Sequence, residues 1–368
     1  MQSLGALLSL MLFDSSAVMR ESDSNVSQNS SSSGKGPFNQ DLVFPDDAYA
    51  AVLWILFWAA IHSVMLRGVI VPLSYRLIGL PSHLLKSAKI SNDQTCSSQT
   101  LPATPESSAR SRKKSNSQPL NSKALGVASP TNDNDYAAQI KQIEKDRAKL
   151  QLAMWKCLSY CITVSMGVYT LAQDTWWSQP ELYFKGYPHL TTSTMKIYYN
   201  IGFGNYAYQL YTLFHEPRQS DFWAMFTHHI CTLVVMGVSY FTSFTRIGTV
   251  ILLLHDFADP IMEFAKCWLY CKNQRMADVF FGLFAATFLI TRNYIFPFHV
   301  ISACIPYGVY EDGERMPRGY AQYFWICVSC LCLLQVLNLN WGYLICKMVY
   351  RTVTAGKVGE DIRDADVE

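Results

Sequence analysis

The chain has 368 residues, of which 50% are apolar and 14% aromatic, and only 16% carry a formal charge. Soluble domains average about 25% charged residues, so this composition points to a membrane protein. The net charge of +2 gives no global basic field, which argues against a nucleic-acid partner.

The N-terminal 47 residues are predicted to form a polar, Ser-rich and disordered arm. This arm contains two N-x-[ST] sequons, at Asn25 and Asn29, which are candidate glycosylation sites. A glycan acceptor is used only in the lumen, so these sites favour a lumenal N-terminus.

About seven apolar stretches follow, and each is long enough to be a transmembrane helix, since about 20 residues cross a bilayer core. The predicted fold class is therefore an all-α polytopic membrane protein. Arg67 interrupts the first stretch, so a shorter span ending at Leu66 with an amphipathic continuation is the alternative there. The predicted spans are 48–73, 153–173, 195–214, 222–242, 246–268, 277–303 and 321–349.

The linker between the first two spans carries an independent orientation signal. Residues 78–150 are rich in Ser, Pro and Asn and contain the basic run "RSRKK" at 110–114. Because short basic connections stay on the cytosolic side, this linker is predicted to be cytosolic. Seven spans then put the N-terminus in the lumen and the acidic tail, residues 351–368, in the cytosol.

Ionisable residues inside the predicted spans concentrate in two consecutive segments. "MFTHH" at 225–229 brings His228 and His229, and "HDFAD" at 255–259 brings Asp256 and Asp259. Such groups cost about 2.5–3.5 kcal/mol at the centre of a membrane helix, so they are functional candidates by default. Counting 1.5 Å per residue places His228 and Asp259 at a similar depth, and a direct contact between them is expected.

Three interpretations of this cluster differ in their chemistry. The groups could neutralise one another as polar contacts between helices. A carboxylate that orients an imidazole for proton transfer or nucleophilic attack is the catalytic interpretation, which the number of groups at one depth favours. A di-iron site would need many histidines at HxxxH or HxxHH spacing, but the chain has eight histidines and a single adjacent pair. No metal site is therefore predicted.

Five ordered segments in 176–298 resemble the ceramide synthases, the acyl-transferring branch of the TLC-domain membrane proteins. The resemblance implies a TLC-type six-helix bundle over 151–350, preceded by one N-terminal helix at 48–77. The segments are "WWSQPELYFKGYP" at 176–188, "YYNIGFGNYAYQL" at 198–210, "RQSDFWAMFTHH" at 218–229, "FTRIGTVILLLHDFADPIMEFAK" at 244–266 and "TRNYIFPF" at 291–298.

The resemblance further implies transfer of a fatty acyl group from acyl-CoA to a sphingoid base in the endoplasmic reticulum membrane. Acyl-CoA would be a co-substrate, with no permanently bound cofactor, and the family often works as dimers or with accessory subunits. It implies catalytic roles for the histidine pair, with the two Asp of "HDFAD" as orienting carboxylates or proton acceptors. Acyl-chain preference would be tuned in the segment 305–320.

Contacts are predicted for both substrates, the CoA portion of acyl-CoA and the head group of the sphingoid base. The anionic CoA would meet basic residues at the cytosolic mouth, namely Arg218, Lys272, Arg275 and Lys347. Arg292, deep in the sixth span, is a candidate contact for the sphingoid head. Asn338 is a further candidate and stands where the family often has a histidine.

Two other classes of protein share parts of this pattern. A non-enzymatic TLC-type protein, acting as a translocon helper or lipid sensor, is the alternative, but it should lack the paired histidines and the two aspartates. A fatty-acid elongase would show HxxHH, whereas this chain has Met225 at the first of those positions.

Overall fold

The computed structural model describes residues 46–79, 133–308, 310–311, 314–315 and 318–355, and these are almost entirely helical. A short antiparallel pair, β1 (Tyr310–Glu311) and β2 (Glu314–Arg315), precedes the last helix. The helices, in chain order, are α3 (Asp46–Met65) with a π-helical turn (Leu66–Ile70) and α4 (Val71–Leu77), α6 (Asp133–Ala172), two 3-10 turns (Trp176–Ser178 and Pro180–Tyr183), α7 (Ser193–Leu213), α8 (Phe222–Phe241), α9 (Thr245–Asp256), α10 (Asp259–Tyr270), α11 (Gln274–Phe288) with its π-helical continuations η4 (Leu289–Ile301) and η5 (Cys304–Gly308), and α12 (Arg318–Ala355).

The predicted all-α membrane fold is confirmed, because a helical segment covers each of the seven predicted spans. The first helix continues past Arg67 as a π-helical turn instead of ending at Leu66. Four helical segments are long and apolar enough to cross a membrane by length and composition, namely Asp46–Leu77, Phe222–Phe241, Gln274–Tyr307 and Ala321–Thr354. Membrane crossing by the other three segments stays a prediction, because polar side chains and a helix break lower their apolar length.

Contacts divide the chain into two compact units, Leu73–Lys149 and a larger unit that contains the rest. Within the smaller unit, the guanidinium of Arg147 lies 4.0 Å from the centre of the Tyr75 ring and donates a hydrogen bond of 2.8 Å to the carbonyl of Ile78. The cation–π contact and the hydrogen bond together hold the first half of α6 against α4 and the residues that follow it.

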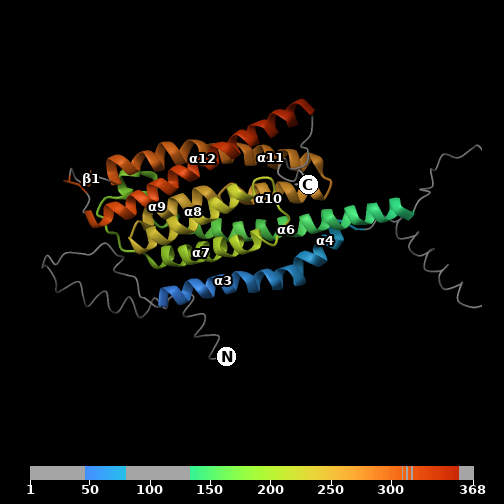
Figure 1. The fold of residues 1–368 in the computed structure, drawn as a ribbon, viewed down its shortest axis with the longest axis horizontal. Helices are drawn as coiled ribbons and strands as arrows, with labels where there is room; N and C mark the ends of the chain where they lie inside the picture. The colour runs from blue at the N-terminus through green and yellow to red at the C-terminus, as the bar shows by residue number, and fades with distance from the viewer. Residues whose placement is uncertain (1–45, 80–132, 309, 312–313, 316–317, 356–368) are drawn as a thin grey trace, which may run out of the picture. The chain divides into compact units, whose positions relative to one another are not determined.

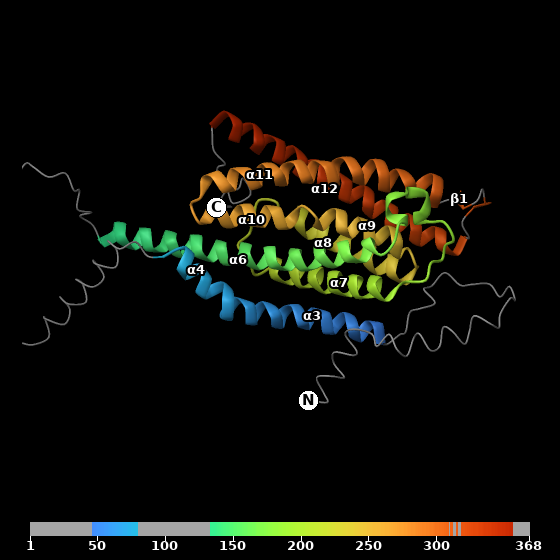
Figure 2. The same cartoon turned by 180° about the vertical axis from the view of Figure 1, so that it is seen from behind.

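Within the larger unit, α7 lies between α3 and α8, and α8 in turn packs against α12 (Figures 1 and 2). The contact between α3 and α7 depends on a glycine: a Cβ at Gly204 would lie 2.9 Å from the Cβ of Trp54. The indole nitrogen of Trp58 also donates to the carbonyl of Ile201 at 3.0 Å. The first helix is therefore fixed to α7 by close packing and a buried hydrogen bond.

The predicted single span at 246–268 is two helices of 12 residues each, α9 and α10, with Phe257 and Ala258 between them. Pro260 explains the break: it has no N–H to continue the helical ladder, and its ring disfavours helical geometry in the residue before it. The break falls inside "HDFAD" and therefore sets the directions in which Asp256 and Asp259 point.

Candidate functional site

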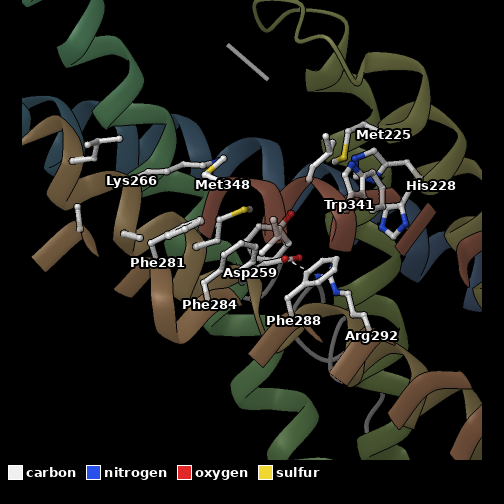
Figure 3. A pocket seen from close by; sticks show the side chains of 18 of the residues that line it. Met225, His228, Asp259, Lys266, Phe281, Phe284, Phe288, Arg292, Trp341 and Met348 are labelled. Carbon is white, nitrogen blue, oxygen red and sulfur yellow. Dashed lines mark hydrogen bonds and ion pairs between the residues drawn. The ribbon is translucent and has the colours of Figure 1, made fainter. Parts of the chain in front are cut away.

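A cavity of about 140 Å³ lies between α8, α10, α11 and α12 and contains the histidine pair. Figure 3 shows Lys266, Phe281 and Met348 toward one end, and His228 and Trp341 toward the other. The lining residues are Tyr160, Tyr206, Met225, His228, His229, Asp259, Met262, Ala265, Lys266, Leu269, Ala277, Phe281, Phe284, Phe288, Arg292, Trp341, Leu344, Ile345 and Met348. A mostly apolar cavity with a few polar groups at one end is typical of a site for a small molecule with an apolar part.

His228 and His229 lie side by side on α8, with ring centres 5.6 Å apart, and both line the cavity. Both are buried, with exposed fractions of 7% and 3%. The Nδ1 atom of each ring has no hydrogen-bond partner among the residues that the structure describes. Buried polar atoms normally have partners, so these two nitrogens are available to a bound substrate or to water.

Asp256 is fully buried and does not line the cavity. The hydroxyl of Tyr206 donates a hydrogen bond of 2.5 Å to its Oδ1 atom. The Tyr206 ring itself lines the cavity, with its centre 6.2 Å from that of His228 and 5.8 Å from that of His229. Tyr206 therefore connects a carboxylate outside the cavity lining to the space beside the histidine pair.

Asp259 lines the cavity too, but its partner is Arg292 rather than His228. An Nη atom of Arg292 lies 2.6 Å from Asp259 Oδ1 and also donates to the carbonyl of His255. The expected direct contact between His228 and Asp259 differs from this arrangement, because it assumed one continuous helix through "HDFAD". Arg292 instead bridges the break between α9 and α10 and gives the buried carboxylate a counter-charge.

His255 is held by hydrogen bonds at both ring nitrogens. Its Nδ1 atom lies 2.9 Å from the carbonyl of Ile251, and its Nε2 atom lies 3.3 Å from the amide nitrogen of Asn338. Since one contact needs a donor on the ring and the other an acceptor, the ring is neutral with its proton on Nδ1. Asn338, predicted as a substrate contact, is fully buried, does not line the cavity and positions His255.

The predicted CoA-binding residues are all exposed, and none of them lines the cavity. Lys272 lies in the turn between α10 and α11, and Arg275 lies in the first turn of α11, so both fall in the chain between the cavity residues Leu269 and Ala277. Lys347 precedes the cavity residue Met348, and Arg218 lies in the connection to α8 with its guanidinium 4.8 Å from the Phe222 ring centre. Lys272, Arg275 and Lys347 are therefore close in the chain to residues that line the cavity.

Three further polar residues at the site were given no role by the sequence alone. They are Tyr206, Lys266 and His255, and the signal that could have identified Tyr206 is its position among buried polar residues of α7, Asn205 and Gln209. Lys266 lines the cavity, and its Nζ atom is 2.9 Å from Glu263. The sequons at Asn25 and Asn29 lie outside the described residues.

Within the described ranges, no group of three or more His, Cys, Asp or Glu side chains has an arrangement that could hold a metal ion. Among the described residues that line the cavity, the buried side-chain polar atoms without a hydrogen-bond partner are the Nδ1 atoms of His228 and His229 and the Nε atom of Arg292. The two histidine nitrogens are the basic ones. Their chemistry is that of proton transfer or nucleophilic attack.

The fold and the site define a multi-pass membrane protein with a TLC domain, and the sequence pattern of that domain matches residues 149–347. The chain belongs to the ceramide synthase family. It is 36% identical to ceramide synthase LOH2 of Arabidopsis thaliana over 240 residues, which is 64% of this chain and 79% of that protein. It is 31% identical to human ceramide synthase 5 over 217 residues, 59% of this chain and 54% of that protein.

Proposed function

We propose that the protein transfers a fatty acyl group from acyl-CoA to the amine of a sphingoid base and so forms ceramide or dihydroceramide. The observation that supports this most directly is the buried pair His228 and His229, each with a free Nδ1 atom, at one end of a largely apolar cavity. Membership of the ceramide synthase family makes this the first reaction to test.

The reaction breaks the thioester C–S bond and forms an amide C–N bond. The substrate ammonium loses two of its three protons; one ends on the departing CoA sulfur, and the other goes to a base of the site. A thioester is already activated, so the site must mainly supply a base or a nucleophile where the acyl carbonyl stops. In our proposal the imidazoles of His228 and His229 do this, one as nucleophile or base and the other as second base or oxyanion donor.

The two carboxylates take different parts in this proposal. Asp259 is ion-paired to Arg292, so it serves mainly to orient the site. Asp256 has a neutral phenol as its partner, and Tyr206 can pass a proton to it while accepting one from the cavity. Asp256 is thus the better candidate for the group that takes the proton of the substrate ammonium.

Acyl-CoA would enter at the end of the cavity that Lys266 lines, with Lys272, Arg275 and Lys347 as the nearest predicted CoA contacts in the chain. The positive-inside rule puts these cations on the cytosolic side, where CoA is dissolved. Its phosphates would bind them as charge-assisted contacts. We place the protein in the endoplasmic reticulum membrane, with its N-terminus lumenal, on the same argument and on the family membership.

The test is to incubate the purified protein in detergent or vesicles with acyl-CoAs of graded length and a long-chain base. Mass spectrometry then detects the N-acyl product, with controls that omit either substrate. Product that requires both substrates supports the proposal. Absence of N-acyl product at every acyl length, from protein that remains folded, would contradict it.

A further inference from the structure

Two smaller cavities, of about 20 Å³ each, continue from the histidine site along α8, α9 and α12. Tyr206 lines both the large cavity and the first small one, which also contacts His255. The two small cavities share Ser239 and Gly248 in their walls. The three spaces therefore follow one another from the reacting groups toward the opposite end of the helices.

The walls of the small cavities suit an alkyl chain rather than the CoA portion. No charged side chain lines either one, and the hydroxyl of Tyr199 is satisfied at 3.1 Å from Ser239 Oγ. From His228 to Ser239 is 11 residues of α8, or about 16 Å at 1.5 Å per residue. An apolar chain that starts at the histidine pair would bury its methylenes along this path.

Gly248 lies where the two small cavities meet, and the hydroxyl of Tyr199 occupies the place that a side chain at this position would take. A Cβ at this position would collide with the hydroxyl of Tyr199 and lie 3.1 Å from Ser239 Oγ. Because the hydroxyl is held by hydrogen bonds to Ser239 and the carbonyl of Thr245, it cannot move aside freely.

Three phenylalanine rings close the far end of the second small cavity. Phe184, Phe244 and Phe324 all line it, with ring centres 6.0–6.3 Å apart and exposed fractions of 2–4%. Phe184 comes from the connection between α6 and α7, Phe244 from the connection between α8 and α9, and Phe324 from the first turns of α12. The cap is thus separate from the segment 305–320.

We propose that Gly248 and Phe184 determine acyl-chain length, with Gly248 leaving room for the Tyr199 ring in the wall midway along the path and Phe184 setting where the path ends. This inference rests on the proposed acyl transfer, and it assigns the two small cavities to the acyl chain. Each methylene that loses its burial costs about 0.8 kcal/mol, which corresponds to about fourfold in the ratio of long to short product.

The experiment gives wild type and variants an equimolar mixture of saturated acyl-CoAs with one long-chain base and reads the product lengths by mass spectrometry. Gly248→Ala is expected to lower the long-to-short ratio by at least fourfold, and Phe184→Leu to raise it. Gly237→Ala, on α8, is the matched control, because a Cβ there meets nothing within 4 Å; its product profile is expected to match wild type.

Unchanged product lengths in an active Gly248→Ala protein would overturn the proposal, as would an equal shift in Gly237→Ala. If Gly248→Ala does not fold, the acyl length of the products of Phe184→Leu tests the proposal. Longer products support it, and unchanged or shorter products overturn it. Wild-type protein that makes no N-acyl product would instead contradict the proposed function.

Discussion

The ion pair between Arg292 and Asp259 allows a quantitative test of how the site is held together. The side chains are only 7% and 13% exposed, and the same arginine donates to the carbonyl of His255. Replacing Arg292 by Met removes every donor while keeping an apolar side chain, so Asp259 is left buried without its counter-charge. Breaking such a pair costs about 3–5 kcal/mol, so Arg292→Met should strongly destabilise the protein.

The double variant Arg292→Met, Asp259→Asn removes the stranded charge together with its partner. Its destabilisation should therefore be smaller than the sum of the two single variants, with a coupling of about 2–3 kcal/mol. The free energy of unfolding of the wild type, the two single variants and the double variant is measured in detergent at neutral pH by tryptophan fluorescence. Additive single effects would refute the inference that this pair fixes the break between α9 and α10.

Three other predictions concern different parts of the molecule. Tyr206→Phe removes the hydroxyl that donates to Asp256, so it should lower kcat about 100-fold or more and leave the melting temperature close to wild type. Steady-state kinetics and a melting curve check this, and an unchanged kcat would exclude proton transfer through Tyr206 to Asp256. Gly204→Ala should cost about 1–3 kcal/mol, since its Cβ would meet Trp54 at 2.9 Å; thermal unfolding beside the control Gly237→Ala measures it, and equal melting temperatures would contradict the packing. Burial lowers the pKa of His189, in the connection before α7, to about 4. As the pH falls, His189 is therefore protonated in the unfolded chain before it is protonated in the folded one, and the free energy of unfolding should fall by about 2 kcal/mol between pH 8 and pH 5. His189→Gln should reduce that fall, and an unchanged pH dependence in this variant would contradict the role of His189.

The sequence was sufficient to predict helices at all seven segments and a cluster of polar groups inside them. Apolar runs of about 20 residues fix the helices, and polar residues in such runs are conspicuous, as His228 and His229 are. Both histidines, together with Asp259 and Arg292, line one cavity. This part was predictable because charge and hydrophobicity are properties of the residues themselves.

The pairing within the cluster could not be predicted, because it depends on a local break in one helix. Counting 1.5 Å per residue along one continuous helix through Pro260 placed Asp259 at the depth of His228, whereas the break leaves Asp259 paired with Arg292. Tyr206 escaped notice because a tyrosine in an apolar helix is ordinary, and its role depends on a hydrogen bond to Asp256 that only the tertiary structure shows.

The most direct test of the central claim compares N-acyl product formation by histidine variants that differ only in position. His228→Ala and His229→Ala, singly and together, remove the imidazoles that line the cavity, whereas His215→Ala removes an exposed one in the connection before α8. With acyl-CoA and a long-chain base, the cavity variants should lose most of the product and His215→Ala should retain it. Activity that survives in the double variant would contradict the assignment of this cavity as the site of acyl transfer.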